Sequence, residues 1–222
     1  MPFFKINSEN KIIITNFKVM FTSFKRTENF TKLKRSEASL RLKLCRPTVY
    51  FTVRDPYQKA ISFYKDKFQK IPMNADLSKP FKWEKPQRIF FPLMNLSVTE
   101  NSAEEIKQAL INTSFESFIG LLAKCYHLDE HINPQHWIFN HPKYCFLKKL
   151  GVDIENVAIF RIEDSADMAE FSSQTGFDFS QKANSTTGIN KDYSMSSKML
   201  DTLHSIYDKD FEYFGYEKRS IH

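Results

Sequence analysis

Three residues near the start of the chain have side chains suited to binding a phosphate or a sulfate. Lys18, Thr22 and Ser23 follow the β-branched run at residues 12–15. A loop that leaves a strand and enters a helix presents unpaired N–H groups and the positive end of the helix dipole to an anion. The segment lacks the glycine-rich pattern of an ATP- or GTP-binding loop. From the residues alone, two interpretations stay open: an anion-binding loop, or a surface lysine beside a helix cap.

A second candidate pair, Arg54 and Ser62, follows another β-branched run at residues 48–53. Arg54 offers a planar fork that can bind a phosphate through two hydrogen bonds. Ser62 lies about two helical turns further along and adds a hydroxyl donor. Ligands of open α/β sheets bind at the carboxyl edge of the strands, which is where both loops would lie. The competing interpretation is a turn closed by an ion pair between Arg54 and Asp55.

The histidines and cysteines do not form a pattern typical of a metal site. His127, His136 and His141 are close in the sequence, but their spacing fits no single helix face, and no Cys or Asp completes a familiar ligand set. The cysteines are Cys45, Cys125 and Cys145. They are widely spaced and odd in number, so neither a metal site nor a disulfide framework is predicted.

The two β-branched runs predict buried parallel strands. Each run is followed by a helical stretch, residues 22–30 after the first and residues 57–68 after the second. A strand, a tight loop and a helix, repeated, are typical of a parallel α/β sheet. The apolar run at residues 157–162 predicts a third strand.

The rest of the chain is predicted to be helical, apart from one irregular segment. Further helices are expected at residues 102–110, 114–126, 165–175 and 194–207. Ser102 and Glu105 form a capping-box pattern, and Gly176 is placed to end the helix before it. Residues 70–101 contain four of the nine prolines and show no clear period. We predict that they form an excursion from the core that contributes to substrate specificity.

Length and composition predict one soluble domain over residues 1–222. With 41% hydrophobic residues, the chain is long enough for one substantial core. No stretch approaches the roughly 20 apolar residues that span a bilayer. The N-terminus is too polar for a secretory signal, so a cytoplasmic location is expected. The oligomeric state is not predicted.

A formal net charge of +6 favours an anionic partner. The basic stretch at residues 32–43 has two open interpretations, a track for an acidic polymer or a solvated helix. A nucleic-acid-binding protein is a further function class that the charge alone would suggest. The chain lacks the interleaved aromatic and glycine patterns of RNA-binding modules, so no nucleic acid partner is expected.

The two candidate anion-binding segments resemble known motifs. Lys18-x-x-x-Thr22-Ser23 resembles the 5′-phosphosulfate loop of sulfotransferases that use 3′-phosphoadenosine 5′-phosphosulfate (PAPS), usually written P-K-x-x-x-S/T-S. The segment from Arg54 to Tyr64 resembles their 3′-phosphate motif, R-D-P-x-x-R-x-x-S-x-Y. Order and separation fit the branch that contains membrane-bound carbohydrate sulfotransferases and their bacterial relatives. The chain departs from these motifs at Phe17, where proline is usual, at Phe21, where a small residue is usual, and at Lys59, where arginine is frequent.

Further segments extend the resemblance over most of the chain. They lie at residues 115–118, 129–135, 160–164, 184–186 and 206–216. In the same order, they are similar to the family patterns F-x-x-F, H-W-x-P-Q, R-x-E-D, N-x-S/T and Y-x-x-D-F-x-x-F-G-Y. Several ordered matches are far more specific than any one of them.

The resemblance implies an α/β fold of the P-loop-like, three-layer type, with a central parallel sheet flanked by helices. It also implies transfer of a sulfuryl group from PAPS to a hydroxyl of a carbohydrate acceptor, with release of 3′-phosphoadenosine 5′-phosphate (PAP) and no required metal. Lys18 would stabilise the bridging oxygen, and the backbone near Thr22 and Ser23 would hold the 5′-phosphate. Arg54 and Ser62 would bind the 3′-phosphate.

The general base is the least determined residue of the implied site. Several relatives place it between the two phosphate motifs, an interval that in this chain contains Glu28 and Glu37 but no histidine. His131 matches the histidine of the family's H-W-x-P-Q segment. We select His131 as the base, with the two glutamates as alternatives. The alternative function is a non-catalytic module of the same fold that binds PAP.

Overall fold

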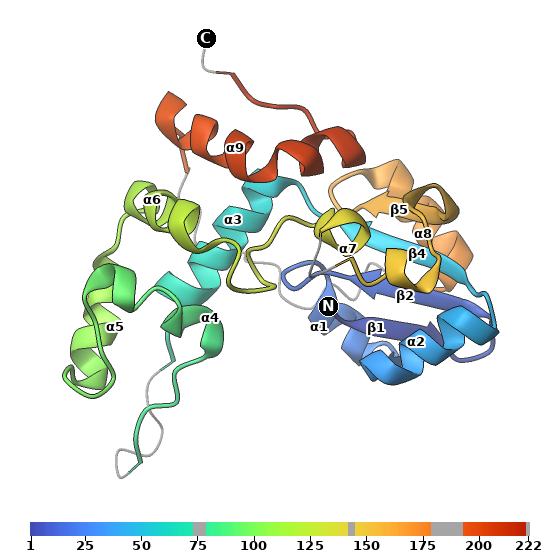
Figure 1. Cartoon of the computed structure of the whole chain (residues 1–222), viewed down its shortest axis with the longest axis horizontal. Helices are drawn as coiled ribbons and strands as arrows, with labels where there is room; N and C mark the ends of the chain where they lie inside the picture. The colour runs from blue at the N-terminus through green and yellow to red at the C-terminus, as the bar shows by residue number, and fades with distance from the viewer. Residues whose placement is uncertain (73–78, 142–144, 179–192, 221–222) are drawn as a thin grey trace. The chain divides into compact units, whose positions relative to one another are not determined.

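The computed structural model describes residues 1–72, 79–141, 145–178 and 193–220 (Figure 1). The chain divides into two compact units. The first contains Met1–Asp55, Pro134–Asp192 and Lys209–Tyr216, and the second contains Pro56–Asn133, Tyr193–Asp208 and Glu217–His222. The predicted Asn184-Ser185-Thr186 loop lies outside the described residues.

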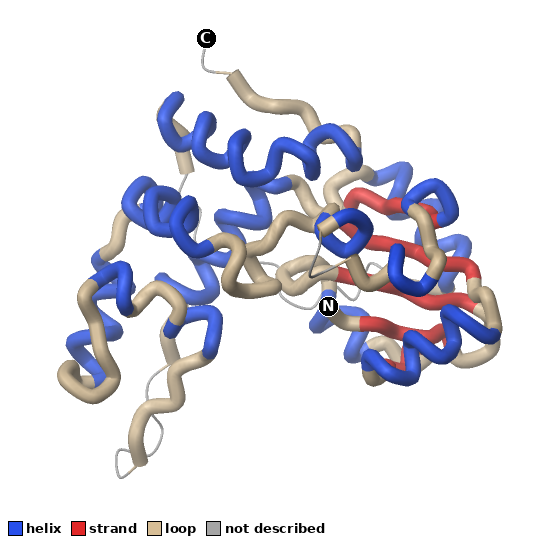
Figure 2. The backbone as a smooth tube through the Cα atoms, in the orientation of Figure 1, coloured by secondary structure: helices blue, strands red, loops and turns tan. Residues whose placement is uncertain are grey.

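The first unit is built on a five-stranded sheet of order β3-β1-β2-β4-β5, whose strands lie side by side in Figure 2. The strands are β1 (Phe3–Ile6), β2 (Lys11–Thr15), β3 (Phe30–Leu33), β4 (Thr48–Val53) and β5 (Val157–Arg161). The neighbours β2 and β4 are parallel, with Thr15 opposite Thr52, and β4 and β5 are also parallel. The two predicted buried parallel strands and the third predicted strand are therefore confirmed.

Helices cover both faces of this sheet, because successive strand residues point to opposite sides. On one face, Ile12 and Ile14 pack in a cluster with residues of α2 (Arg35–Leu44) and α7 (Trp137–Asn140). On the other face, Ile13 packs in a cluster with residues of α1 (Phe21–Arg26) and α8 (Ser165–Thr175). The predicted three-layer α/β architecture is confirmed.

The sheet also has an antiparallel extension that the sequence analysis did not predict. Strand β1 pairs antiparallel with both β2 and β3, so the sheet is mixed. The helix predicted over residues 22–30 is too long, because α1 ends at Arg26 and Phe30 begins β3. Phe30 is opposite Ile6 in the sheet, and its ring centroid is 5.7 Å from that of Phe24. Strand pairing and core packing thus override the local helical pattern.

The second unit is helical in its described part. It contains α3 (Pro56–Tyr64), α4 (Lys85–Arg88), α5 (Ala103–Asn112) and α6 (Phe115–Cys125), together with a π-helical turn at Lys65–Gln69 and a 3-10 turn at Pro92–Met94. The predicted capping box at α5 is confirmed, since the Ser102 hydroxyl accepts from the Glu105 N–H at 3.2 Å and the Glu105 carboxylate accepts from the Ser102 N–H at 2.7 Å.

Aromatic rings form the centre of this second unit. Phe63, Phe68, Phe90 and Phe118 are fully buried. The Phe90 ring centroid lies 5.0 Å from that of Phe68 and 5.8 Å from that of Phe118. Phe90 comes from the predicted excursion at residues 70–101, so part of that segment contributes to the core of the second unit.

The last helix, α9 (Ser197–Phe214), begins three residues later than predicted and continues beyond the predicted end at Tyr207. Tyr207 has non-helical backbone angles inside it, with φ −111° and ψ 18°. None of the helices in the described part of the chain combines the length and the apolar character needed to cross a bilayer.

Gly120 lies on an exposed position inside α6, and a Cβ atom added to it would meet no other atom within 4 Å. We therefore expect Gly120→Ala to raise the free energy of unfolding by about 0.5–1 kcal/mol, because alanine has less backbone freedom to lose on folding. Gly176 ends α8 with φ +68° and is the matched control. Gly176→Ala should lower the stability, since an alanine is strained at that angle. Urea unfolding of both variants measures the two changes, and a stabilising Gly176→Ala would contradict this account.

Candidate functional site

The loop after β2 is held in a sharply turned conformation. Lys18 and Met20 both have left-handed backbone angles, with φ 69° and φ 52°. Such angles cost energy for residues other than glycine and persist where surrounding contacts fix them. The contacts here are a hydrogen bond from the Thr15 hydroxyl to the Val19 carbonyl and one from the Val19 N–H to the Asn16 carbonyl at 3.2 Å. The loop carrying Lys18 is therefore preformed.

The loop leads directly into α1, which no side chain caps. The Phe24 N–H makes the first intrahelical bond, to the Met20 carbonyl at 3.0 Å. The N–H groups of Phe21, Thr22 and Ser23 precede it and so belong to the turn that has no intrahelical acceptor. Lys18, Thr22 and Ser23 thus lie where the sequence predicted them, on a loop between a strand and the first turn of a helix.

The phenylalanine at the family's small-residue position is half-buried and packs against the core. The Phe21 ring centroid lies 6.0 Å from that of Phe4 and 5.8 Å from that of Phe17. Phe21 also packs against the hydrophobic cluster that contains Phe24. The bulk of Phe21 is therefore accommodated by aromatic contacts of the first unit.

Arg54 contacts the same loop directly. Its Nη1 donates to the Lys18 carbonyl at 2.8 Å, and its Nε lies 3.5 Å from Oε1 of Glu163. Only 23% of the Arg54 side chain is exposed. Burial lowers the pKa of Arg54 from its ordinary value, while the Glu163 carboxylate acts in the opposite direction. Since a guanidinium stays charged in proteins, the structure brings a cation that directly follows β4 against the Lys18 loop.

The backbone of Arg54 is clamped by the side chain of Gln135. The Arg54 N–H donates to Gln135 Oε1 at 3.0 Å, and Gln135 Nε2 donates to the Arg54 carbonyl at 2.7 Å. Gln135 is fully buried. Its amide therefore pairs with Arg54 as a neighbouring strand would, just beyond the end of β4.

Gln135 is held in turn by a buried carboxylate on α9. Asp210, which has no exposed surface, accepts from the N–H of Gln135 at 2.8 Å and from the N–H of His136 at 2.9 Å. The His136 ring nitrogen Nδ1 lies 2.7 Å from the same carboxylate. A buried carboxylate is costly unless it is fully hydrogen-bonded, and these partners meet that need.

Glu163 lies beside the Arg54 guanidinium and makes two further hydrogen bonds. Its carboxylate accepts from the Asp55 N–H at 3.2 Å and from the Tyr216 hydroxyl at 3.1 Å. Although 33% of its side chain is exposed, burial raises the pKa of Glu163 above its ordinary value, against the lowering effects of the Asp55 N–H and Arg54. Burial likewise raises the pKa of Tyr216.

Buried polar atoms without a hydrogen-bond partner also occur at this edge of the sheet. They are Asn16 Nδ2, Thr52 Oγ1 and Arg54 Nε. Buried polar groups in proteins are nearly always satisfied, so unpartnered ones suggest an absent ligand. Two of the three, Asn16 Nδ2 and Arg54 Nε, are donors only, and Arg54 Nε also lies 3.5 Å from the Glu163 carboxylate.

Two of the predicted site residues, Ser62 and His131, belong to the second unit. Ser62 is a half-buried residue of α3. His131 pairs with Asp129, with Nδ1 2.6 Å from Oδ1. Burial acts to raise the pKa of Asp129, but the hydrogen bonds from His131 outweigh it, and the net shift is downward. An anionic Asp129 that orients an imidazole is the arrangement expected for a histidine base.

The two alternative bases lie at the surface, whereas Lys59 lies in the interior of the second unit. Glu28 and Glu37 are exposed, and Glu37 lies in the first turn of α2. Lys59 is buried in the second unit, where its ammonium donates to the Asn133 carbonyl. It also lies 5.4 Å from the centre of the Tyr207 ring. Lys59, at the family's arginine position, thus stabilises the turn before Pro134.

Among the residues that the structure describes, no group of three or more His, Cys, Asp or Glu side chains could hold a metal ion. Cys45, Cys125 and Cys145 form no disulfide bond. Burial raises the pKa of Cys125 to about 12, so it is not a nucleophile at neutral pH.

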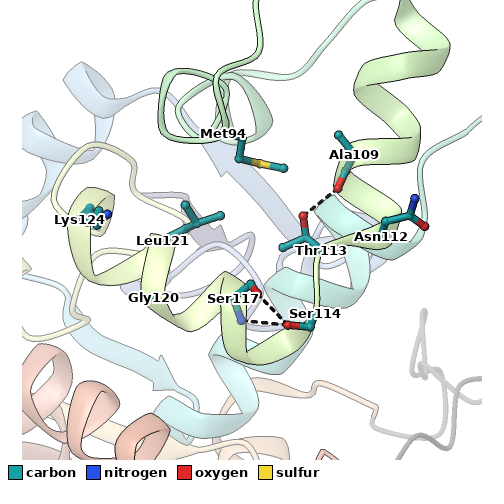
Figure 3. Close-up of a pocket in the computed structure, with 9 residues that line it drawn as sticks. All are labelled: Met94, Ala109, Asn112, Thr113, Ser114, Ser117, Gly120, Leu121 and Lys124. Atoms are coloured by element: carbon teal, nitrogen blue, oxygen red, sulfur yellow. Dashed lines mark hydrogen bonds between the residues drawn. The ribbon is translucent and has the colours of Figure 1, made fainter.

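A pocket of about 590 Å³ lies in the second unit between α5, α6 and Met94 (Figure 3). Several of its polar groups serve local structure: the Thr113 hydroxyl donates to the Ala109 carbonyl at 2.8 Å, and the Ser114 hydroxyl donates to Ser117 at 2.9 Å. None of the predicted nucleotide-binding residues lines it, so it is not the predicted nucleotide site.

Four polar residues at this site were not predicted from the sequence: Gln135, Glu163, Asp210 and Tyr216. All four lie inside the segments that resemble family patterns, which was the available signal. Their polar side chains are brought around Arg54 by chain segments far apart in the sequence, and only the tertiary structure shows that grouping.

Comparison with protein-family models matches residues 4–217 to the model described as the sulfotransferase family. Comparison with curated proteins and with solved structures gave no match. The family match covers nearly the whole chain and both phosphate motifs. It supports sulfuryl transfer as the chemistry of this protein.

The raised pKa of Glu163 makes a testable prediction about stability. Between the unfolded-state pKa of about 4.3 and the raised folded-state value, the folded protein binds more protons than the unfolded chain, so stability falls as the pH rises. Glu163→Gln cannot titrate. Its stability relative to the wild type should therefore be higher at pH 7 than at pH 4, as measured by urea unfolding.

The control is Glu100→Gln, at an exposed carboxylate. Its stability relative to the wild type should change less between the two pH values. A relative stability of Glu163→Gln that is lower at pH 7 would show that Arg54 dominates over burial.

Proposed function

Because the chain belongs to the sulfotransferase family, we propose that it transfers a sulfuryl group from PAPS to a hydroxyl of a carbohydrate and releases PAP. The observation that carries the donor assignment is the contact between the two motif residues, in which Arg54 donates to the Lys18 carbonyl at 2.8 Å. Segments that resemble the 5′-phosphosulfate loop and the 3′-phosphate motif are thereby joined at one edge of the sheet.

In this proposal, the donor nucleotide is bound by fixed cations and hydrogen-bond donors. Lys18, Thr22 and Ser23 would hold the 5′ end, since the loop is preformed and leads into an uncapped helical turn. Arg54 would bind the 3′-phosphate as a charge-assisted hydrogen-bond donor, with Ser62 as a second donor. Asn16 Nδ2 and Arg54 Nε, two buried donors that make no hydrogen bond, support an anion at this edge.

The reaction is an in-line displacement at sulfur. The bond between sulfur and the bridging phosphate oxygen breaks, and a bond forms between sulfur and the acceptor oxygen. Negative charge builds on the leaving oxygen, which is why a lysine ammonium held beside it lowers the barrier. The acceptor hydroxyl gives its proton to a base, which we propose is His131 with Asp129 as its orienting partner.

The carbohydrate acceptor is inferred from the branch of the family whose motifs the chain resembles. The formal net charge of +6 suits an acidic saccharide. The alternative, a non-catalytic module that binds PAP, makes a different experimental prediction: nucleotide binding without transfer.

The donor and the reaction are tested with PAPS carrying a labelled sulfate and a panel of glycans. We expect transfer by the wild type, and a kcat reduced by about 10²–10³ in Lys18→Ala with a smaller change in the KM for PAPS, because the lysine contact strengthens as charge develops. Lys198→Ala, at an exposed position on α9, is the matched control and should keep the wild-type rate.

Stabilisation by PAP without transfer to any acceptor would favour the non-catalytic alternative. A folded Lys18→Ala protein with the wild-type kcat would show that Lys18 does not act on the leaving oxygen. A thermal melt verifies that the variant is folded.

The base assignment is tested by comparing three variants. His131→Ala should lower kcat by about 10²–10⁴ and leave PAP affinity unchanged, because loss of a general base affects only proton transfer. Glu28→Gln and Glu37→Gln should retain activity. If either glutamine variant loses activity while His131→Ala keeps it, the base lies between the two phosphate motifs.

A further inference from the structure

We propose that Gln135 is a positioning residue that fixes the backbone of Arg54 and thereby gives the site its selectivity for a 3′-phosphate. This inference rests on the proposed function, because it assumes that Arg54 binds that phosphate. Gln135 would not contact the nucleotide itself.

The first observation is the geometry of the clamp. Gln135 uses both halves of its amide on one residue, accepting from the Arg54 N–H at 3.0 Å and donating to the Arg54 carbonyl at 2.7 Å. The two bonds hold the peptide units on both sides of the Arg54 Cα, so they restrict the backbone rotation of Arg54 as well as its position. Arg54 follows the last residue of β4, Val53, so the sheet ladder does not supply these bonds.

The second observation is that Gln135 is itself rigidly held. It is fully buried, and its own N–H donates to the buried Asp210 carboxylate at 2.8 Å. The next residue, His136, makes two further contacts with that carboxylate, at 2.9 Å and 2.7 Å. A positioning group is effective only if its own supports are fixed, and this condition is met.

The third observation concerns the contacts of the Arg54 guanidinium. Its guanidinium reaches the Lys18 carbonyl at 2.8 Å, while Nε lies 3.5 Å from Glu163 and has no hydrogen bond. A shift of the Arg54 backbone would carry the guanidinium away from any phosphate that it binds. Charge-assisted hydrogen bonds weaken steeply with such misplacement.

The experiment measures the affinities of PAP and of adenosine 5′-phosphate (AMP), which lacks the 3′-phosphate, by calorimetry. Gln135→Met keeps the length of the side chain and removes both hydrogen bonds. We expect PAP affinity to fall on the order of tenfold, since small misplacements of positioned groups have effects of this size or larger. AMP affinity should stay within twofold of the wild type. Gln108→Met, at an exposed position on α5, is the matched control and should change neither affinity.

A double-mutant cycle separates positioning from a general structural effect. In an Arg54→Ala background, Gln135→Met should no longer change PAP affinity, because the side chain that it positions is gone. An equal loss of PAP and AMP affinity, or the same loss of PAP affinity in the Arg54→Ala background, would overturn the inference.

Failure of the proposed function gives a different result. If the wild type binds PAP no more tightly than AMP, and Arg54→Ala changes neither, then the 3′-phosphate site itself is wrong. If Arg54→Ala weakens PAP binding but Gln135→Met does not, only the positioning role is wrong.

Gln135→Glu provides a second variant should the methionine substitution prevent folding. Glutamate keeps the shape and still accepts from the Arg54 N–H, but its carboxylate cannot donate to the Arg54 carbonyl. At pH 8, the ratio of PAP affinity to AMP affinity should be lower in Gln135→Glu than in the wild type. At pH 5 this difference from the wild type should be smaller, because the carboxyl group is more often protonated and can then donate. An unchanged ratio at both pH values would also overturn the inference.

Discussion

The buried carboxylate of Asp210 is the contact on which the arrangement around Arg54 depends. It accepts hydrogen bonds from the N–H groups of Gln135 and His136, and it lies 2.7 Å from the His136 ring nitrogen, all in the interior of the first unit. Removing it would leave these donors unpaired, which costs about 1–3 kcal/mol for each buried group. With it in place, Gln135 is fixed, Arg54 is fixed by Gln135, and Arg54 holds the carbonyl of Lys18.

Parallel pairing of β2 with β4 brings the Lys18 loop and Arg54 to one edge of the sheet. Thr15 and Thr52 are opposite one another in register, so the residues that follow them leave the sheet at the same edge. This is the edge at which open α/β sheets bind their ligands. Strand β1 pairs with β2 on the edge opposite β4, and β3 follows β1. Phe4 of β1 packs against Phe21, so this antiparallel part of the sheet adds apolar contacts to the segment that follows the Lys18 loop.

The departures from the family motifs are explained by packing. Phe21 replaces a small residue, yet its ring lies among Phe4 and Phe17. Lys59 replaces an arginine, and its buried ammonium satisfies the Asn133 carbonyl. Neither departure removes a residue that we propose to contact the nucleotide.

The sequence by itself determined the parallel strands, the helices with clear caps and the identity of the residues that follow β2 and β4, because β-branched runs, capping boxes and motif spacing are local signals. It did not predict β1 and β3. Their extended form depends on pairing with one another and on burial of Phe3 and Phe4, which no local period reveals. Only the tertiary structure decided which polar residues surround Arg54, since Gln135, Glu163 and Asp210 come from distant parts of the chain and meet through folding alone.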